Sequence, residues 1–278
     1  MKPGISSLFF NMLDPYEMAK TFVELGFYQT EINERHYMPF YHKELEVKEY
    51  RKYIDDLGFS IPQGHLFFHN KGNITSLDNA YAISNLKRAL DVFYELGVKA
   101  AVLHYVNFET SVTPVETYFD MRVDALNQLI SHIQGTDMSI CLENLSSIYD
   151  FDAGHLLMMC KAVDDPSHIG ICLDTGHLHL AQKGNQYDFI MQAGKFLKAM
   201  HVHDNRGEYQ GLKDGSCDWH CMPFGSGTIN WHDVKKGVRD SQYEGLFSFE
   251  VGGSGTLEIR KLQAKYMLDV YHTFFAFE

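Results

Sequence analysis

The sequence contains no run of 18 apolar residues, so we expect no helix that crosses a membrane. Its first residues, MKPGISSLFFNMLDPYE, lack the basic start, the long apolar stretch and the small-residue cleavage site of a signal peptide. We therefore expect a cytoplasmic protein without a membrane partner.

The chain also lacks the even, regularly spaced cysteines of a disulfide-rich domain. It has five cysteines, and an odd number without a signal peptide indicates free thiols. Cys217 and Cys221 are spaced closely enough to raise the idea of a zinc knuckle. No second pair of cysteines follows them, so we do not expect one.

A surplus of basic residues is absent as well. The 24 lysines and arginines are outnumbered by 36 aspartates and glutamates, which gives a formal net charge of −12. Proteins that bind nucleic acid non-specifically usually carry the opposite balance. A nucleic-acid partner is therefore disfavoured, although a local basic patch on an acidic protein would be compatible with one.

Short apolar segments alternate with amphipathic ones along the whole sequence. Eight segments are predicted as strands: Ile5–Phe10, Tyr28–Ile32, Ser60–Leu66, Ala100–Tyr105, Ser139–Glu143, Ile169–Asp174, Lys198–His203 and Leu246–Val251. A strand–helix unit repeated eight times implies parallel strands with right-handed crossovers. A chain of 278 residues suits one such domain. We predict an α/β fold, a single (β/α)₈ TIM barrel over residues 1–278.

Potential metal ligands lie at or near the carboxyl ends of six consecutive predicted strands. They are His65, His104, Glu143, Asp174, His201 and Glu250. Because the carboxyl ends of barrel strands converge on one face, these side chains are predicted to meet there. Imidazole together with carboxylate suits zinc or manganese best, with cobalt, iron or magnesium as further options. A cation would also relieve the repulsion among clustered carboxylates.

Four motifs carry a resemblance to a known superfamily. They are Glu143-Asn144, Leu173–His177, His201–Asn205, and Asp218–His220 followed by Pro223–Trp231. In order and spacing the chain resembles the xylose-isomerase-like TIM-barrel superfamily over essentially its full length. That superfamily includes sugar isomerases and epimerases and also endonuclease IV. The resemblance implies an enzyme with a metal site, but it leaves the reaction open because one fold hosts several chemistries.

The sugar-epimerase branch implies one metal held by Glu143, Asp174, His201 and Glu250. The two glutamates would flank the reacting carbon as an acid–base pair, which suits proton removal beside chelated oxygens. His177 and Arg206 would contact the substrate oxygens.

Two further candidates for the substrate pocket come from the sequence itself. Glu31 ends the second predicted strand, and Trp219 lies in the long loop between the last two strands. A salt-bridged Glu31 and a tryptophan that belongs to the core are the alternatives for these two positions.

The endonuclease IV branch implies up to three zinc ions held by nine side chains. All nine types have a match here: His65, His104, Glu143, Asp174, His177, His201, Asp218, His220 and Glu250. Three clustered metals suit hydrolysis of a phosphodiester, such as DNA at an abasic site. A metal-dependent lyase or dehydratase, or a barrel that only binds a ligand, remain further alternatives.

The sequence departs from both branches at particular positions. Arg206 is one position away from the spacing of the epimerase arginine, and Tyr149 stands near the place of a further epimerase glutamate. The endonuclease pattern after the last ligand is replaced by Gly252–Gly255, which is either a phosphate-binding turn or a plain tight turn. The candidate DNA-binding loops hold few basic residues. We therefore expect an isomerase or epimerase for a small sugar-like substrate, as a monomer or homodimer.

Overall fold

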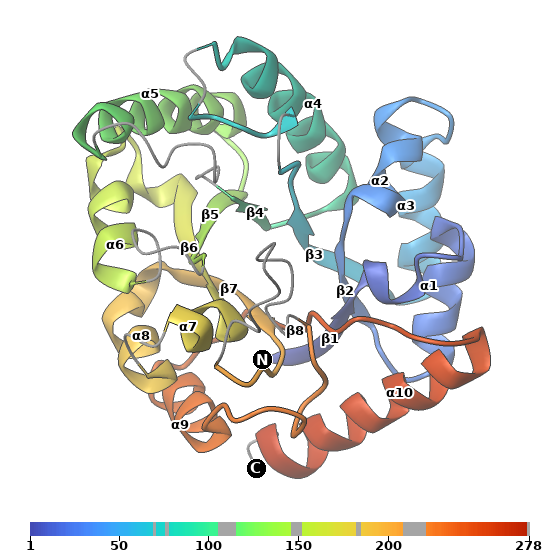
Figure 1. The fold of residues 1–278 in the computed structure, drawn as a ribbon. Helices are drawn as coiled ribbons and strands as arrows, with labels where there is room; N and C mark the ends of the chain where they lie inside the picture. The colour runs from blue at the N-terminus through green and yellow to red at the C-terminus, as the bar shows by residue number, and fades with distance from the viewer. Residues whose placement is uncertain are drawn as a thin grey trace, which may run out of the picture.

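The protein folds as a closed barrel of eight parallel strands, which follow one another around the barrel in sequence order (Figure 1). The computed structural model describes residues 1–68, 71–75, 78–104, 115–145, 152–181, 185–207 and 221–276. The strands are β1 Lys2–Ser6, β2 Gln29–Ile32, β3 Ser60–His65, β4 Ala100–Leu103, β5 Ser139–Glu143, β6 Ile169–Asp174, β7 Leu197–Val202 and β8 Leu246–Phe249. The predicted (β/α)₈ barrel is confirmed.

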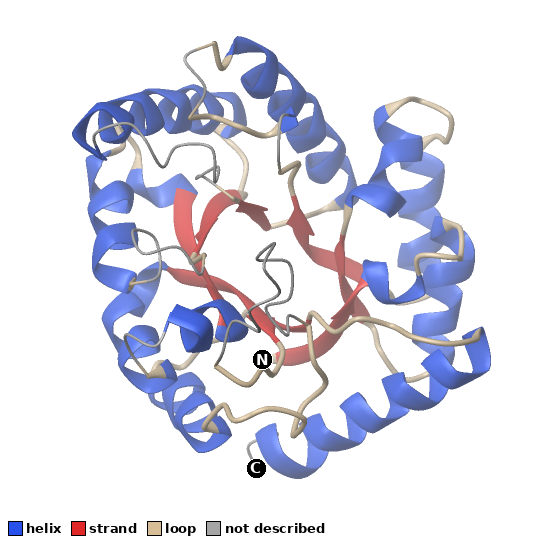
Figure 2. Cartoon of the chain, viewed as in Figure 1, coloured by secondary structure: helices blue, strands red, loops and turns tan. Residues whose placement is uncertain are grey.

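Helices form an outer ring around these strands (Figure 2). They are α1 Pro15–Glu24, α2 Glu34–Tyr41, α3 Val47–Asp56, α4 Ala80–Leu96, α5 Val115–Ile133, α6 Ala153–Ala162, α7 Thr175–Ala181, α8 Gln186–Ala193, α9 Trp231–Asp240 and α10 Leu257–Val270. Within the described ranges, none of them is both long and apolar enough to cross a membrane.

The first predicted strand is partly wrong. The strand is Lys2–Ser6, and the last four residues of the predicted segment form a short 3₁₀ helix, η1, over Ser7–Phe10. Phe9 and Phe10 are wholly buried, with their ring centroids 5.1 Å apart. A short buried apolar segment gives the same hydrophobic signal in either conformation, which explains the error.

Alternation along the strands decides which side chains enter the barrel. A separate small apolar cluster comprises Ala100, Val102, Cys141, Cys172 and Ala199, and the residues between them pack in the larger core beneath the helices. The small cluster therefore fills the barrel interior. Since successive strand residues face opposite sides, the interior face also contains Glu143, Asp174 and His201, each two residues beyond a member of that cluster.

Candidate metal centre

Four side chains from four neighbouring strands converge at the carboxyl end of the barrel. Glu143, Asp174, His201 and Glu250 each offer one ligand atom, and these atoms all lie within 4.8 Å of one another. The Nδ1 atom of His201 lies 3.3 Å from both Glu143 Oε1 and Glu250 Oε2. Glu143, Asp174 and His201 are almost completely buried, and only Glu250 retains an exposed edge.

A second group shares Glu143 with the first. His65, His104 and Glu143 also bring their ligand atoms within 4.8 Å of one another. The Oε2 atom of Glu143 lies 2.9 Å from His104 Nε2 and 3.5 Å from His65 Nε2. The two oxygens of one carboxylate therefore face two different groups of nitrogen and oxygen donors.

Glu31 sits behind His201 and fixes its ring. Its Oε1 lies 2.8 Å from His201 Nε2, and its Oε2 accepts a hydrogen bond of 3.0 Å from the Ser248 hydroxyl. If Nε2 carries the proton that Glu31 accepts, the lone pair of Nδ1 faces the three carboxylates. Carboxylates commonly orient metal-binding histidines in this way. Glu31 is wholly buried, so the structure places it beneath the site.

Asp174 is held from three sides. The backbone N–H of His177 donates to Asp174 Oδ1 at 2.6 Å, and the ring of His203 approaches the same oxygen at 3.0 Å. Asn144 donates to the Asp174 carbonyl and accepts from its N–H. The His177 ring also lies 3.3 Å from Glu143 Oε1. Asn144, which follows the shared glutamate, thus couples β5 to β6.

The carboxylates of the centre have very different pKa values. Burial alone would raise the pKa of Glu143, but His104 and His201 beside it hold that pKa well below its usual range. Burial raises the pKa of Glu250 to about 7, an effect that His201 opposes and the neighbouring carboxylates strengthen. For His177, burial lowers the pKa but Asp174 and Glu143 overcome it and raise it to about 9.

These donors fit a divalent cation. Glu250 Oε2 is buried without a hydrogen-bond partner among the described residues, and so is Glu143 Oε2, whose close contacts with imidazole rings lack hydrogen-bond alignment. Mixed imidazole and carboxylate donors are the usual set for zinc or manganese. A divalent cation would reduce the mutual repulsion of the three carboxylates.

Asp204, which follows the ligand strand β7, holds a neighbouring loop. Its carboxylate accepts hydrogen bonds from the backbone N–H groups of Gly225, Gly227 and Ile229 at 3.0, 2.9 and 3.3 Å. Trp231 adds its indole N–H at 3.3 Å. Asp204 therefore anchors the loop before α9, and His203 is the residue that contacts a ligand carboxylate.

The remaining predicted site residues fall into two sets. Asp218, Trp219 and His220, like Tyr149, lie outside the described residues. Arg206 is described and lies on an exposed position just after the ligand strand. The ring centroid of Phe68 lies 5.7 Å from that of His65 and 5.4 Å from that of His104. It forms an aromatic wall beside the second group.

The turn after Glu250 is engaged internally. The N–H of Gly252 donates to the Cys221 carbonyl at 3.1 Å, and the N–H of Ser254 donates to Gln263 at 3.4 Å. Gly255 has a φ of +77°, which suits glycine in a tight turn. These contacts favour the plain tight turn over a phosphate-binding turn.

A family model described as xylose isomerase-like TIM barrel matches residues 17–269. The chain belongs to this family, as the motifs at the strand ends predicted.

Two curated relatives are similar over part of the chain. An uncharacterized protein of Methanocaldococcus jannaschii is 25% identical over 173 residues, which cover 59% of this chain and 55% of that protein. A probable endonuclease 4 of Mycoplasma pneumoniae is 25% identical over 175 residues, 58% of this chain and 57% of that protein. The chain thus matches little more than half the length of these relatives.

Solved structures share the fold over nearly the whole chain. A D-tagatose 3-epimerase-like protein superposes with a TM-score of 0.78 at 22% identity, covering 98% of this chain and 97% of that one. D-Psicose 3-epimerase from Clostridium cellulolyticum H10 gives a TM-score of 0.80 at 18% identity, with both chains covered completely. The 3-keto-D-glucoside 4-epimerase of E. coli gives 0.77 at 18% identity, covering 96% of this chain and 99% of that one.

Proposed function

We propose that this protein is a divalent-metal-dependent isomerase or epimerase that acts on a small sugar or sugar derivative. The observation that carries the proposal is the buried cluster of Glu143, Asp174, His201 and Glu250, whose ligand atoms lie within 4.8 Å of one another. The sugar epimerases that share the fold support it. We also propose that residues 1–278 form one domain, because β1 pairs with β8 and the barrel closes only with both ends of the chain.

The two glutamates have unequal parts in the proposed reaction. Glu250 has a pKa of about 7, which suits a general base that removes a proton from carbon near neutral pH and returns it as an acid. Glu143 is held as a charged carboxylate by His104 and His201. In an epimerisation, charged Glu143 would remove the proton from one face of the substrate carbon and protonated Glu250 would deliver a proton to the other face, and the reverse reaction would exchange these roles.

Other residues of the site would orient the substrate. His177 lies between Glu143 and Asp174 and is protonated at neutral pH, so it can donate a hydrogen bond to a substrate oxygen. Arg206 and Trp219 remain proposals for further substrate contacts. When bound, a zinc or manganese ion would acidify the C–H beside chelated hydroxyl and carbonyl oxygens.

Replacement of Glu250 by Gln tests this mechanism. The variant keeps the size and hydrogen-bonding capacity of the side chain but loses the transferable proton, so we expect turnover of the sugar substrate to be abolished while the circular dichroism spectrum is unchanged. Ketoses are the first substrates to screen, with exchange of the carbon-bound proton for deuterium followed by NMR. A Glu250→Gln variant that still converts the sugar substrate to product would exclude Glu250 from the acid–base pair.

A phosphodiesterase with up to three metal ions is the second candidate function. The group of His65, His104 and Glu143 favours it, because an epimerase with one metal has no need of a second set of ligands. Two adjacent cations suit displacement at phosphorus. Cleavage of a duplex that contains an abasic site, lost in the His104→Gln variant, would support this function. Epimerisation that His104→Gln leaves intact would favour the first candidate.

A further inference from the structure

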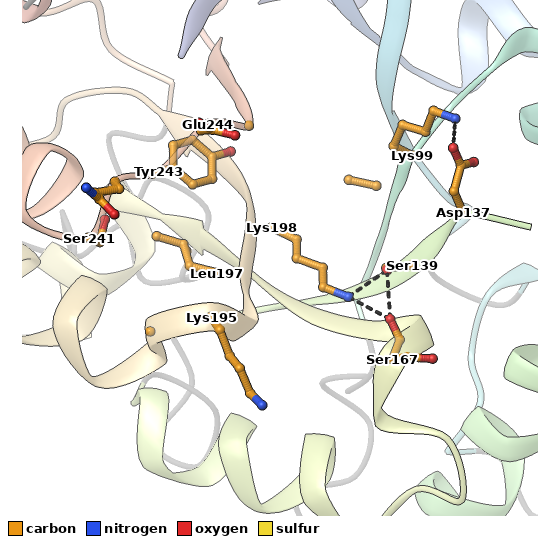
Figure 3. A pocket seen from close by; sticks show the side chains of 14 residues that line it. Lys99, Asp137, Ser139, Ser167, Lys195, Leu197, Lys198, Ser241, Tyr243 and Glu244 are labelled. Carbon is orange, nitrogen blue, oxygen red and sulfur yellow. Dashed lines mark hydrogen bonds and ion pairs between the residues drawn. The ribbon is translucent and has the colours of Figure 1, made fainter.

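A cavity opens at the amino ends of the strands, on the face of the barrel opposite the candidate metal centre. It has a volume of about 510 Å³ and is bordered by Ala100, Ser139 and Leu197, the first residues of β4, β5 and β7, and by Gly245 just before β8 (Figure 3). A neighbouring cavity of about 260 Å³ shares five of its lining residues, so the two form one recess under the barrel.

The recess holds a fixed ammonium group. Lys198 donates hydrogen bonds of 2.8 Å to the Ser139 hydroxyl and 2.9 Å to the Ser167 carbonyl (Figure 3). Its aliphatic stem packs on Gly170, where a Cβ atom would stand only 2.7 Å from Lys198 Cδ. A glycine at position 170 therefore makes room for the stem, and the ammonium is held in place before any ligand arrives.

The charge of Lys198 is not neutralised by an ion pair. Its two hydrogen-bond acceptors are uncharged, and no carboxylate in the described part of the chain lies within ion-pair distance of its Nζ. Burial lowers the pKa of this half-buried lysine, an effect that Cys141, Cys160 and Asp165 oppose only in part. Lys195 adds a second positive charge on the rim, whereas Lys99 is paired with Asp137.

The deeper part of the recess offers an acceptor. Gln63 lines the smaller cavity and is 1% exposed. Its amide nitrogen donates to the Met200 carbonyl at 3.4 Å, but its Oε1 has no hydrogen-bond partner within the described residues. A buried acceptor without a partner is costly, so it favours a donor from outside, such as a hydroxyl.

We propose that this recess binds a small hydroxylated oxyanion, with its phosphate or carboxylate group on Lys198 and a hydroxyl on Gln63. The volume suits a ligand of metabolite size. The site is independent of the proposed catalytic function, because none of its lining residues belongs to the metal centre.

Binding of inorganic phosphate and of acetate to the whole protein, each measured against chloride at equal ionic strength, tests the proposal. The comparison uses wild type, Lys198→Met and Lys48→Met, whose lysine is exposed on α3 away from the recess. Loss of a charge-assisted hydrogen bond should weaken binding about tenfold in Lys198→Met and leave Lys48→Met unchanged. Preference for phosphate or for acetate then identifies the anionic group.

A second measurement on the wild-type protein does not depend on folding of a variant. The protein is acetylated with a limiting amount of an amine-reactive reagent, and the labelled lysines are identified by mass spectrometry. The bound anion should slow acetylation of Lys198 and leave acetylation of Lys48 unaffected. Binding that Lys198→Met does not weaken would place the anion elsewhere, for example at the metal centre. That result, or equal labelling of Lys198 with and without anion, would overturn the proposal.

Discussion

Replacement of Glu31 should weaken metal binding although Glu31 is not expected to touch the metal. The Glu31–His201 contact is 2.8 Å long and both side chains are wholly buried, so water cannot replace a lost partner. Loss of the partner that orients a metal-binding histidine typically costs 10- to 100-fold in affinity, or about 1.4–2.8 kcal/mol.

Two substitutions should give graded losses. Glu31→Gln keeps an oxygen that accepts from His201 Nε2 but loses the negative charge, so we expect a loss of about tenfold, the lower end of that range. Glu31→Ala removes the acceptor altogether and strands both the imidazole N–H and the Ser248 hydroxyl. We expect a loss of about a hundredfold, the upper end.

Competition with a chromophoric chelator at fixed pH measures these affinities. Ser248→Ala is the matched control, since it removes the hydrogen bond to the other oxygen of Glu31 and leaves the His201 contact in place. Ser248→Ala should weaken the free energy of metal binding by about 1 kcal/mol at most. If Glu31→Ala, with an unchanged circular dichroism spectrum, binds metal as tightly as the wild type, the argument that Glu31 sets the tautomer of His201 is refuted.

Three further predictions follow from the same geometry. Metal affinity should fall as the pH drops below about 7, because the raised pKa leaves Glu250 protonated there and its proton must leave before a cation binds. Calorimetry of metal binding in two buffers at pH 6 should show that Glu250→Gln releases about one proton fewer than the wild type. An equal number of released protons would argue against this pKa. Asp204→Asn should lower the free energy of unfolding by about 2 kcal/mol, because the loop of Gly225–Ile229 loses charge-assisted hydrogen bonds. An unchanged free energy of unfolding in urea denaturation would contradict this prediction. Phe247→Ala should lower the free energy of unfolding by about 3–5 kcal/mol, because this ring on β8 is wholly buried and packs against Phe275. A loss below about 1 kcal/mol would show that the site collapses around the cavity.

The residues at the strand ends were predictable from the sequence, because the short apolar segments and the geometry of a parallel barrel indicate the same positions. Each ligand follows a short apolar segment, and parallel barrel strands bring their carboxyl ends together whatever the details of packing. The segments Ser139–Glu143 and Ile169–Asp174 are strands over the predicted ranges. That was sufficient to bring Glu143, Asp174, His201 and Glu250 into one group.

Contacts across the barrel could not be predicted from the sequence. Glu31 and His201 are separated by 170 positions, and no local pattern distinguishes a glutamate that lines a pocket from one that lies beneath it. Asp204 could not be assigned for a related reason, since its partners belong to a loop about twenty residues further along. Such pairings depend on the path of loops and on how far each side chain reaches into the barrel.

The two candidate functions make opposite demands on Glu143. Its Oε1 faces His201, and its Oε2 faces His65 and His104. If a cation occupies each group, both oxygens of this carboxylate are committed to ligation and neither can carry a proton to or from a substrate carbon. With a single cation on the group that contains Asp174, the rings of His65 and His104 stay close to Oε2, and the charges of His104 and His201 keep Glu143 ionised.

The number of metal ions per chain therefore distinguishes between the two proposed mechanisms. Elemental analysis of protein purified without added metal should give close to one equivalent if the epimerase proposal holds. In that case Glu143→Gln should impair proton exchange more than His104→Gln, because only Glu143 belongs to the acid–base pair. Two or three equivalents of zinc would remove Glu143 from proton transfer and shift the weight to hydrolysis of a phosphodiester.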